Sequence, residues 1–308
     1  MNNRVTPLPQ TGPMNTVKQA KWEAELSLGL SKTLRGSVLK QCRHKGPLYV
    51  QKAFYPEGKN LAHIYLLHPP GGMVSGDDLK INVDMENDAQ SLITTPGAGR
   101  VYKARADRTL QTQHIQLRLG PDSTLEWLPL ENIIYPGANT QLNTDIHLEK
   151  NASVIAWEIS CLGLTASNQP FTSGSLRQRL QVFKEGRLTL REALVLKPDE
   201  HNFMLSKAGL ANCSVNALMI AGPFDVAEQE KSEILVKDLQ TICGFLNSQY
   251  KEIEQTVLAA ISLNGEFIQI RYLGNCSEQA RLLFIECWEK IRPQLIERSA
   301  CEPRIWAT

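Results

Sequence analysis

The sequence predicts a mainly β protein in which roughly the last hundred residues form a smaller part that mixes strands with two helices. From residue 21 to residue 205, short segments of alternating or β-branched residues recur, which is the pattern of half-buried strands. Clusters of glycine and proline separate these segments and are typical of tight turns. A helical period of about 3.6 residues occurs only over 227–246 and 277–291.

The first 20 residues are predicted to be a disordered lead-in. They are rich in proline, asparagine and threonine and show no periodicity. They also lack the apolar segment of a secretory signal. Apolar stretches elsewhere are much shorter than the roughly 20 residues that a membrane helix needs. We therefore expect a soluble, cytoplasmic protein.

The β-rich body is expected over residues 21–205. It begins with the alternating segment Ala24–Leu28. The further strands that we expect cover 48–54, 63–67, 79–85, 90–95, 109–119, 124–128 and 141–148. A long hairpin should follow over 176–196, with its turn at Glu185 and Gly186. Short strands punctuated by turns favour a body built from sheets.

Residues 206–308 are expected to form an α+β part packed on that body. A strand at 213–220 precedes the first helix, and a hairpin over 257–272 turns at an Asn-Gly pair before the second helix. Ser277 is expected to cap the second helix, and Pro293 is expected to end it. The predicted order of elements is therefore β-α-β-β-α.

Composition excludes several kinds of partner and cofactor. Thirty-three basic and 32 acidic residues leave a net charge of +1, which gives no electrostatic reason to expect nucleic acid or an anionic membrane. The seven cysteines are odd in number and form no C-x-x-C pair, so neither a disulfide framework nor a zinc knuckle is indicated. The six histidines are scattered and form no metal-storage tract.

The sequence lacks the common catalytic motifs. The glycine-rich segments 69–77 and 96–100 do not have the G-K-[ST] end of a phosphate-binding loop, so we expect tight turns there. There is no G-x-S-x-G elbow, and Cys161 has no histidine near it in the sequence. These observations favour a protein that is not an enzyme.

Several carboxylates lie in or beside apolar strand patterns, namely Glu126, Glu131, Asp145, Glu158 and Glu192. Charged groups are rarely buried unless they are paired or hydrated. These side chains therefore either alternate outward into solvent or line an internal polar passage. Periodicity favours solvent, and pairing partners are offered by Arg177, Arg179 and Arg191.

Five segments occur in the order that one protein family shows. They contain H-P-P-G-G-x-V-x-G-D, T-x-P-G-A, L-E-W-L-P, W-E-x-x-C-L-G and an ending with R-P and P-R-I-W. In this chain the segments are Leu66–Asp77, Thr94–Ala98, Leu125–Pro129, Trp157–Gly163 and Arg292–Thr308. Together they resemble the urease accessory protein D family, called H in some organisms. The similarity extends over residues 48–308.

The resemblance implies a large β-rich body with a β-helix-like or sandwich-like arrangement. It also implies a non-catalytic scaffold in the complex that delivers nickel to urease. The family connects the urease apoprotein to accessory protein F and to the GTPase, accessory protein G, while accessory protein E supplies the nickel. A water-filled internal passage is the proposed nickel route. We therefore expect a transient nickel ion and no tightly bound cofactor.

The resemblance also points to residues along that route. Asp77, Glu158 and Glu192 occupy positions that it places near the passage. Weak, exchangeable oxygen ligands suit an ion in transit better than imidazole or thiolate, which would hold it tightly. Gly99 replaces the small polar residue that is common in the family after the P-G-A turn, so no polar role is expected there.

A partner-binding surface is expected at the C-terminal end, which the family uses to bind accessory protein F. The residues are Trp288, Arg304, Ile305 and Trp306. Two other interpretations of the chain remain open. One is an enzyme with an unrecognised carboxylate site, and the other is a plain interaction scaffold through which no metal passes.

Overall fold

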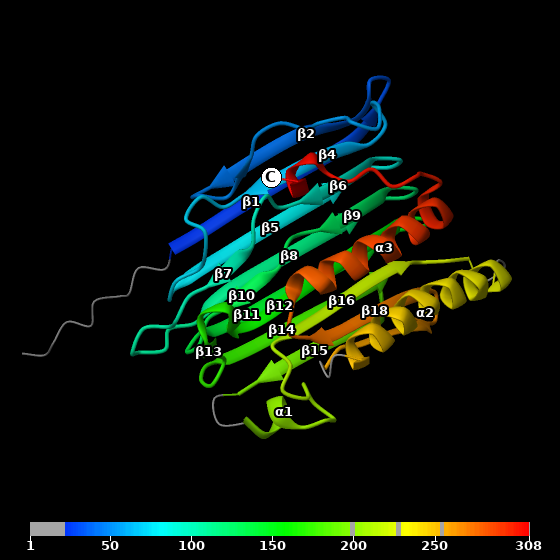
Figure 1. Ribbon diagram of the computed structural model, residues 1–308. Helices are drawn as coiled ribbons and strands as arrows, with labels where there is room; N and C mark the ends of the chain where they lie inside the picture. Colours follow the sequence, from blue (N-terminus) through cyan, green and yellow to red (C-terminus); the bar gives the residue numbers. More distant parts are fainter. Residues whose placement is uncertain (1–21, 198–200, 226–228, 253–255, 308) are drawn as a thin grey trace, which may run out of the picture.

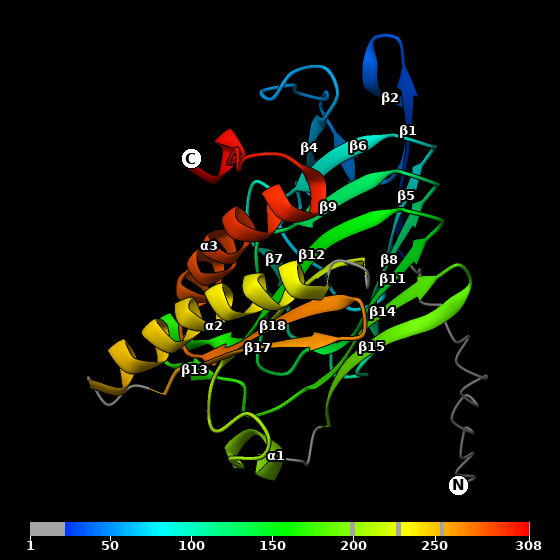
Figure 2. The same cartoon turned by 90° about the vertical axis from the view of Figure 1, so that its right-hand side faces the viewer.

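Two β-sheets pack face to face, and helices cover the outer face of one of them (Figure 1). This computed structural model describes residues 22–197, 201–225, 229–252 and 256–307, so the lead-in expected over residues 1–20 lies outside it. Figure 2 shows the three layers from the side: a seven-stranded sheet, an eleven-stranded sheet and a helical layer. The mainly β fold class with a small helical part is confirmed.

The seven-stranded sheet has the spatial order β15-β14-β11-β8-β5-β1-β2. Its strands are β1 (Trp22–Thr33), β2 (Gly36–Lys45), β5 (Asp77–Met85), β8 (Gln111–Leu119), β11 (Asn139–Leu148), β14 (Ser175–Lys184) and β15 (Arg187–Leu196). The expected hairpin is present, because β14 and β15 pair in antiparallel fashion around Glu185 and Gly186. The edge strand β2 was not expected from the sequence.

The eleven-stranded sheet has the main order β17-β18-β16-β12-β9-β6-β4-β3. Those strands are β3 (Tyr49–Val50), β4 (Ala62–Leu67), β6 (Gln90–Thr94), β9 (Thr124–Leu128), β12 (Ser153–Leu164), β16 (Val215–Gly222), β17 (Leu258–Asn264) and β18 (Phe267–Gly274). Three short strands pair beside that path: β7 (Gly99–Val101), β10 (Asn132–Ile134) and β13 (Gln169–Pro170). The helices are α1 (His201–Leu205), α2 (Gln229–Glu252), α3 (Ser277–Ile296), η1 (Thr165–Ser167) and η3 (Arg304–Ala307).

Between β4 and β14 the chain alternates from one sheet to the other. β4, β6, β9 and β12 lie parallel in the eleven-stranded sheet, while β5, β8, β11 and β14 lie parallel in the other. Each pair of consecutive strands therefore forms one turn of a flattened coil, so the body is β-helix-like in its path and sandwich-like in its packing. The strands β16, β17 and β18 continue the larger sheet in antiparallel fashion.

The strand burial follows from this layering. In β5, alternate residues from Asp77 to Met85 are buried, because one face packs against the other sheet and the opposite face is more accessible. In β9, all five residues are buried. A strand that is covered on both faces is buried at every residue rather than at alternate residues. Two cores result: an inner core between the sheets and an outer core between the larger sheet and the helices.

Two expectations about α3 were wrong. Cys276, not Ser277, is the residue that precedes the helix, and no side chain caps it. The helix also passes through Pro293 and ends only at Ile296, where Glu297 adopts a left-handed conformation with φ of 56°. Packing explains the continuation, since Arg292 is fully buried and Leu295 packs on the outer core on the far side of the proline.

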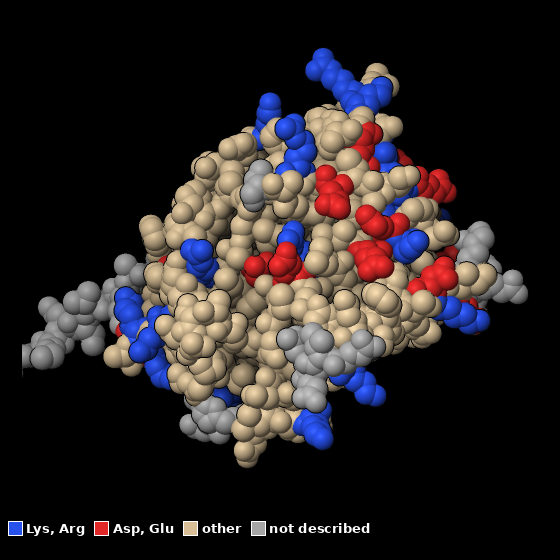
Figure 3. Space-filling model, viewed as in Figure 1, with Lys and Arg blue, Asp and Glu red and all other residues tan. Residues whose placement is uncertain are grey.

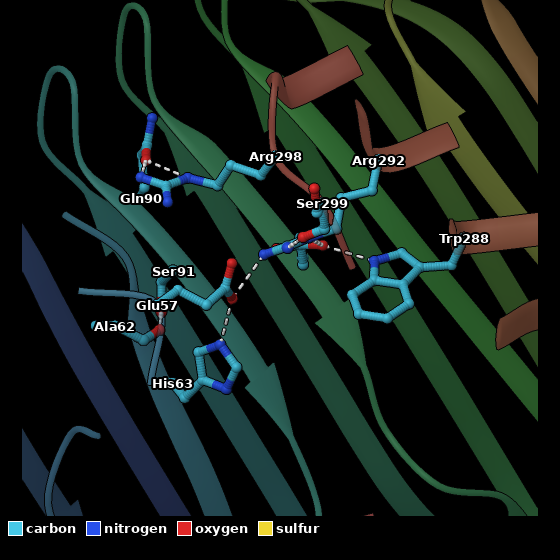
Figure 4. A network of polar contacts seen from close by, with 10 residues as sticks. Glu57, Ala62, His63, Gln90, Ser91, Trp288, Arg292, Arg298 and Ser299 are labelled. Carbon is cyan, nitrogen blue, oxygen red and sulfur yellow. Dashed lines mark hydrogen bonds and ion pairs between the residues drawn. The ribbon is translucent and has the colours of Figure 1, made fainter. Parts of the chain in front are cut away.

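A buried ionic network ties α3 to the eleven-stranded sheet (Figure 4). Arg292 is fully buried, and its Nε and Nη2 donate to the two carboxylate oxygens of Glu126 at 2.9 and 3.0 Å. Trp288 Nε1 donates to Glu126 Oε1 at 2.6 Å. Glu126 lies on the central strand β9, so this contact fixes the helix across the sheet.

The network extends to the loop before β4. Arg292 Nη2 also donates to Glu57 Oε1 at 2.7 Å, and His63 Nε2 lies 2.7 Å from the same oxygen. Burial alone would raise the pKa of Glu57. The hydrogen bonds from His63 and Arg292, together with the charge of Arg292, outweigh that effect and lower the pKa to about 2.

Replacing Arg292 with methionine should lower the free energy of unfolding by about 3–5 kcal/mol, because Glu126 would remain as an uncompensated buried charge. Urea denaturation followed by circular dichroism measures the effect. Lys290→Met is the control, since Lys290 is exposed on the same helix and should change stability by less than about 0.5 kcal/mol. Equal stability of the two variants would contradict the role of the network.

Candidate functional site

The three carboxylates that the sequence analysis placed on a metal route all belong to strand faces that point between the sheets. Asp77 shares its face of β5 with the inner-core residue Leu79, and Glu158 shares its face of β12 with Ala156. Glu192 likewise shares its face of β15 with Leu190, which packs in the inner core. Because alternate residues of a strand share a face, the polar groups interrupt an otherwise apolar layer.

Cavities lie beside these carboxylates in the inner layer. The largest of these three has a volume of about 430 Å³. Its lining is largely apolar and also includes the polar side chains of His68, Thr95, Arg100, Gln113, Asn132, Thr144, Glu158 and Gln178. A second cavity of about 210 Å³ is lined by the same two residues and by Glu192. A third, of only about 10 Å³, is lined by Asp77 and shares His68 with the largest. Each of the three predicted residues therefore lines at least one of three cavities that have lining residues in common.

Glu158 and Gln178 stand where the two larger cavities adjoin, and they are hydrogen-bonded to each other. Gln178 Nε2 donates to Glu158 Oε2 at 2.7 Å, and Thr144 Oγ1 donates to Glu158 Oε1 at 2.5 Å. Ser160 Oγ donates to Gln178 Oε1 at 2.8 Å. We call Thr144, Glu158, Ser160 and Gln178 the Glu158 group.

The charge of Glu158 is poorly compensated. Burial raises the pKa of its carboxyl, and the hydrogen bonds from Thr144 and Gln178 offset the increase only in part. All three neighbours in the Glu158 group are neutral, in contrast to the arginine that faces Glu126. A cation that reached the junction of the cavities would therefore find a carboxylate whose ionised form it would stabilise.

Glu192 has a cationic neighbour on the opposite sheet. Arg271 Nη2 of β18 donates to Glu192 Oε1 at 2.5 Å, and Gln269 Nε2 lies 3.3 Å from the same oxygen. Arg271 Nη1 donates to Gln269 Oε1 at 3.2 Å. We call Glu192, Gln269 and Arg271 the Glu192 group, and two of its members, Glu192 and Arg271, line the second cavity.

Asp77 has a local structural contact. Its Oδ2 accepts a hydrogen bond from the backbone N–H of Val74 at 2.8 Å, and its own N–H donates to the carbonyl of Val74 at 3.0 Å. The side chain therefore closes the turn that leads into β5. Asp77 is buried, and it lines the smallest of the three cavities.

The other carboxylates do not face the cavities. Glu126 points to α3, where Arg292 neutralises it. Asp145 lies on the outer face of the seven-stranded sheet, with His114 Nε2 at 2.9 Å and Arg179 Nη2 at 3.2 Å. The pairing offered by Arg179 is therefore confirmed, and Glu131 is not among the residues that line the cavities.

Sequence reasoning missed the neutral and basic members of the site. Gln178 and Thr144 come from adjacent parallel strands of the seven-stranded sheet, and Arg271 comes from β18 of the other sheet, much later in the chain. One signal was available for Gln178, because it interrupts the apolar alternation between Leu176 and Leu180. The contact between Arg271 and Glu192 depends on how the two sheets align, which no local pattern reports.

A tight metal centre is not evident in the described part of the chain. Residues 22–197, 201–225, 229–252 and 256–307 contain no group of three or more histidine, cysteine, aspartate or glutamate side chains placed to hold a metal ion. Burial raises the pKa of Cys161 to about 12, so this thiol stays protonated near neutral pH and is a poor ligand. The polar side chains at the cavities offer oxygen atoms that are spread along the inner layer.

The expected partner-binding residues differ in accessibility. Trp288 is fully buried, so its side chain forms part of the outer core and not of the surface. Trp306 and Ile305 are half-buried, and Arg304 is exposed. The ring centroids of Trp157 and Trp306 lie 5.7 Å apart, and Trp306 Nε1 donates to Thr94 Oγ1 at 2.9 Å. The C-terminal segment thus closes the outer core.

The outward face of α3 beside this segment carries negative charge. Figure 3 shows acidic side chains gathered over α3, and Glu278, Glu286 and Glu289 of that helix are exposed.

No helix among the described residues is long and apolar enough to cross a membrane.

Known proteins resemble this chain over almost its entire length. The profile of the family described as UreD urease accessory protein matches residues 23–307. A urease accessory protein UreD from Marinomonas sp. (strain MWYL1) is 49% identical over 305 residues, with 98% of this chain and 95% of the relative covered. Proteins of the same name from Psychromonas ingrahamii and Hahella chejuensis are 38% and 36% identical, covering 96% and 93% of this chain and 97% and 91% of theirs.

Replacing Glu158 with glutamine should leave the free energy of unfolding unchanged or increase it at pH 8. The raised pKa means that the carboxyl contributes stability below its ordinary pKa and loses that contribution as pH rises through the folded-state value. The amide cannot ionise, so the variant should show a flatter dependence of stability on pH. Urea denaturation between pH 4 and 9 measures this. A large loss of stability at pH 8 would show that the ionised carboxylate is a structural requirement.

Proposed function

The chain belongs to the UreD family of urease accessory proteins, and we propose that it passes nickel to apo-urease through the cavities between its two sheets. The resemblance found in the sequence is confirmed by the family profile and by the relatives. Family membership supports a role in the maturation of urease. The nickel route, the absence of catalysis and the identity of each partner are parts of the proposal.

The observation that carries the proposal is the position of Glu158 between the two larger cavities. Its carboxylate has neutral hydrogen-bond donors and reaches both cavities. Carboxylate, hydroxyl and amide oxygens can hold a divalent ion in transit, whereas several imidazole or thiolate ligands would trap it. Asp77 lines the smallest cavity and Glu192 lines the second, so each adds a carboxylate beyond Glu158.

The chain would act within a larger assembly in the cytoplasm. In this proposal the urease apoprotein receives the ion, accessory protein F binds the C-terminal segment, and the GTPase accessory protein G joins through that complex. Accessory protein E acts indirectly, as the supplier of nickel. No part of the proposal involves nucleic acid or a membrane, and the chain contributes a passage and binding surfaces but no catalytic step.

A plain interaction scaffold is the second candidate. Two contacts favour it: Asp77 is used to close a local turn, and Glu192 is already paired with Arg271. In a scaffold without a metal route, both side chains would have only structural roles. Glu158 distinguishes the two candidate functions. Its hydrogen-bond partners are neutral, so a purely structural role would not require a negative charge at this position.

Urease produced without this chain should remain folded and contain little nickel, and urease produced with the Glu158→Gln variant should show at least a severalfold loss of nickel. The amide keeps the size of the side chain and removes its charge. Co-expression with the urease subunits and the other accessory proteins, followed by metal analysis of purified urease, measures the result.

Asp145→Asn is the matched control for Glu158→Gln. It removes a carboxylate on the opposite face of the neighbouring sheet, away from the cavities. Urease matured with this variant should contain normal nickel. Full nickel content with Glu158→Gln would leave the plain scaffold as the better interpretation, and full content without the chain would overturn the maturation role itself.

Arg304→Ala should weaken co-purification with accessory protein F severalfold and leave the melting temperature unchanged. Arg304 is exposed, and arginine is frequent among the residues that dominate binding energy. Lys290→Ala, on the exposed face of α3, is the control. Trp306→Ala should instead lower the melting temperature, because Trp306 packs against Trp157 and Trp288. Undiminished binding by Arg304→Ala would exclude this segment as the docking surface.

A further inference from the structure

The second cavity contains a positive charge on the proposed route of a cation. Arg271 Nη2 is 2.5 Å from Glu192 Oε1, and both residues line this cavity. A divalent ion approaching Glu192 would meet a carboxylate that already has a cationic partner. The position of Arg271 therefore needs an explanation that the passage alone does not give.

The ion pair differs in environment from the buried pair at α3. The side chains of Arg271 and Glu192 are 44% and 30% exposed, whereas those of Arg292 and Glu126 are both 0% exposed. Breaking a fully buried pair leaves an uncompensated charge and is strongly unfavourable. A partly exposed pair contributes little net free energy, because water can replace each partner. Separating Arg271 from Glu192 therefore requires little free energy.

We propose that Arg271 is a displaceable counter-ion that occupies Glu192 when the second cavity is empty and competes for it when a divalent cation arrives. The inference rests on the proposed function, since it assumes that the cation comes from the Glu158 side. Arg271 remains tethered to β18 next to the carboxylate, so its charge repels the cation after displacement. Glu192 then attracts the ion without retaining it.

A purely structural role would be a tie between the sheets, because Glu192 is on β15 and Arg271 is on β18. The chain offers a matched pair for comparison. Lys184 of β14 lies 2.6 Å from Glu266, in the turn before β18, and both side chains are 27% exposed. This second pair joins the same two sheets, and neither residue lines a cavity described above.

The test is equilibrium dialysis of the full-length protein against Ni²⁺. Arg271→Gln should bind Ni²⁺ on the order of tenfold more tightly than the wild type, because a positive charge within a few ångströms of the ion is removed. Arg271→Lys keeps the charge and should bind like the wild type, and Lys184→Gln should do the same. The double variant Arg271→Gln with Glu192→Gln should not show this increase in Ni²⁺ affinity, because the carboxylate that retains the ion is gone.

Equal Ni²⁺ affinity of Arg271→Gln, Lys184→Gln and the wild type would overturn the inference. A measurement on the wild type avoids dependence on a variant that folds poorly: saturating Ni²⁺ should perturb the NMR signal of the Arg271 Nε–H group and leave that of Lys184 Nζ unchanged. An unperturbed Arg271 signal would also overturn the inference. Failure of the proposed function is recognised separately, as normal nickel content in urease matured without the chain.

Discussion

The eleven-stranded sheet has to be covered on both faces, and the rest of the architecture follows from this constraint. Strands such as β9 are buried along their whole length. Exposing either face to water would therefore lose a large amount of hydrophobic free energy. The seven-stranded sheet covers one face, and α2 and α3 cover the other. Any charged residue on these strands must then be neutralised or hydrated inside the protein.

The two glutamates of the central strands meet this requirement in different ways. Glu126 faces the helical layer and has a permanent cationic partner, Arg292, with Trp288 as a further donor. Glu158 faces the other sheet and is bonded to Thr144 and Gln178, which carry no charge. The charge of Glu126 is therefore neutralised by residues of the same chain. The arrangement at Glu158 leaves a carboxyl with a raised pKa at two cavities, where a visiting cation would complete it.

The sequence predicted many strands well, because a strand period of two residues is visible in residues such as Leu79–Met85 and an Asn-Gly pair marks a hairpin. The expectation from periodicity that the strand carboxylates face solvent was wrong for Glu126, which is fully buried against α3, and for Glu158, which points between the sheets. The same period assigned Asp77, Glu158 and Glu192 to inward-facing positions only after the strand partners were known. Alternation reports a face and gives no information about which sheet that face meets. Thus Glu126 and Glu158 had equivalent patterns, although the partner of Glu126 lies 166 positions away in the chain. The edge strand β2 was missed because most of its residues are exposed.

The cavities explain how an apolar inner core could admit an ion. Apolar side chains such as Leu79, Ile115 and Leu142 line part of the largest cavity and offer a cation no ligands. Its volume of about 430 Å³ accommodates several water molecules, so an ion could keep part of its hydration shell there. Where the cavities adjoin, Glu158 and Gln178 occupy the boundary and would have to replace some of that water. On the proposed route, a negative charge would stabilise an ion that had lost part of its water at that point, which would give a role to a carboxylate that the packing of the core alone would disfavour.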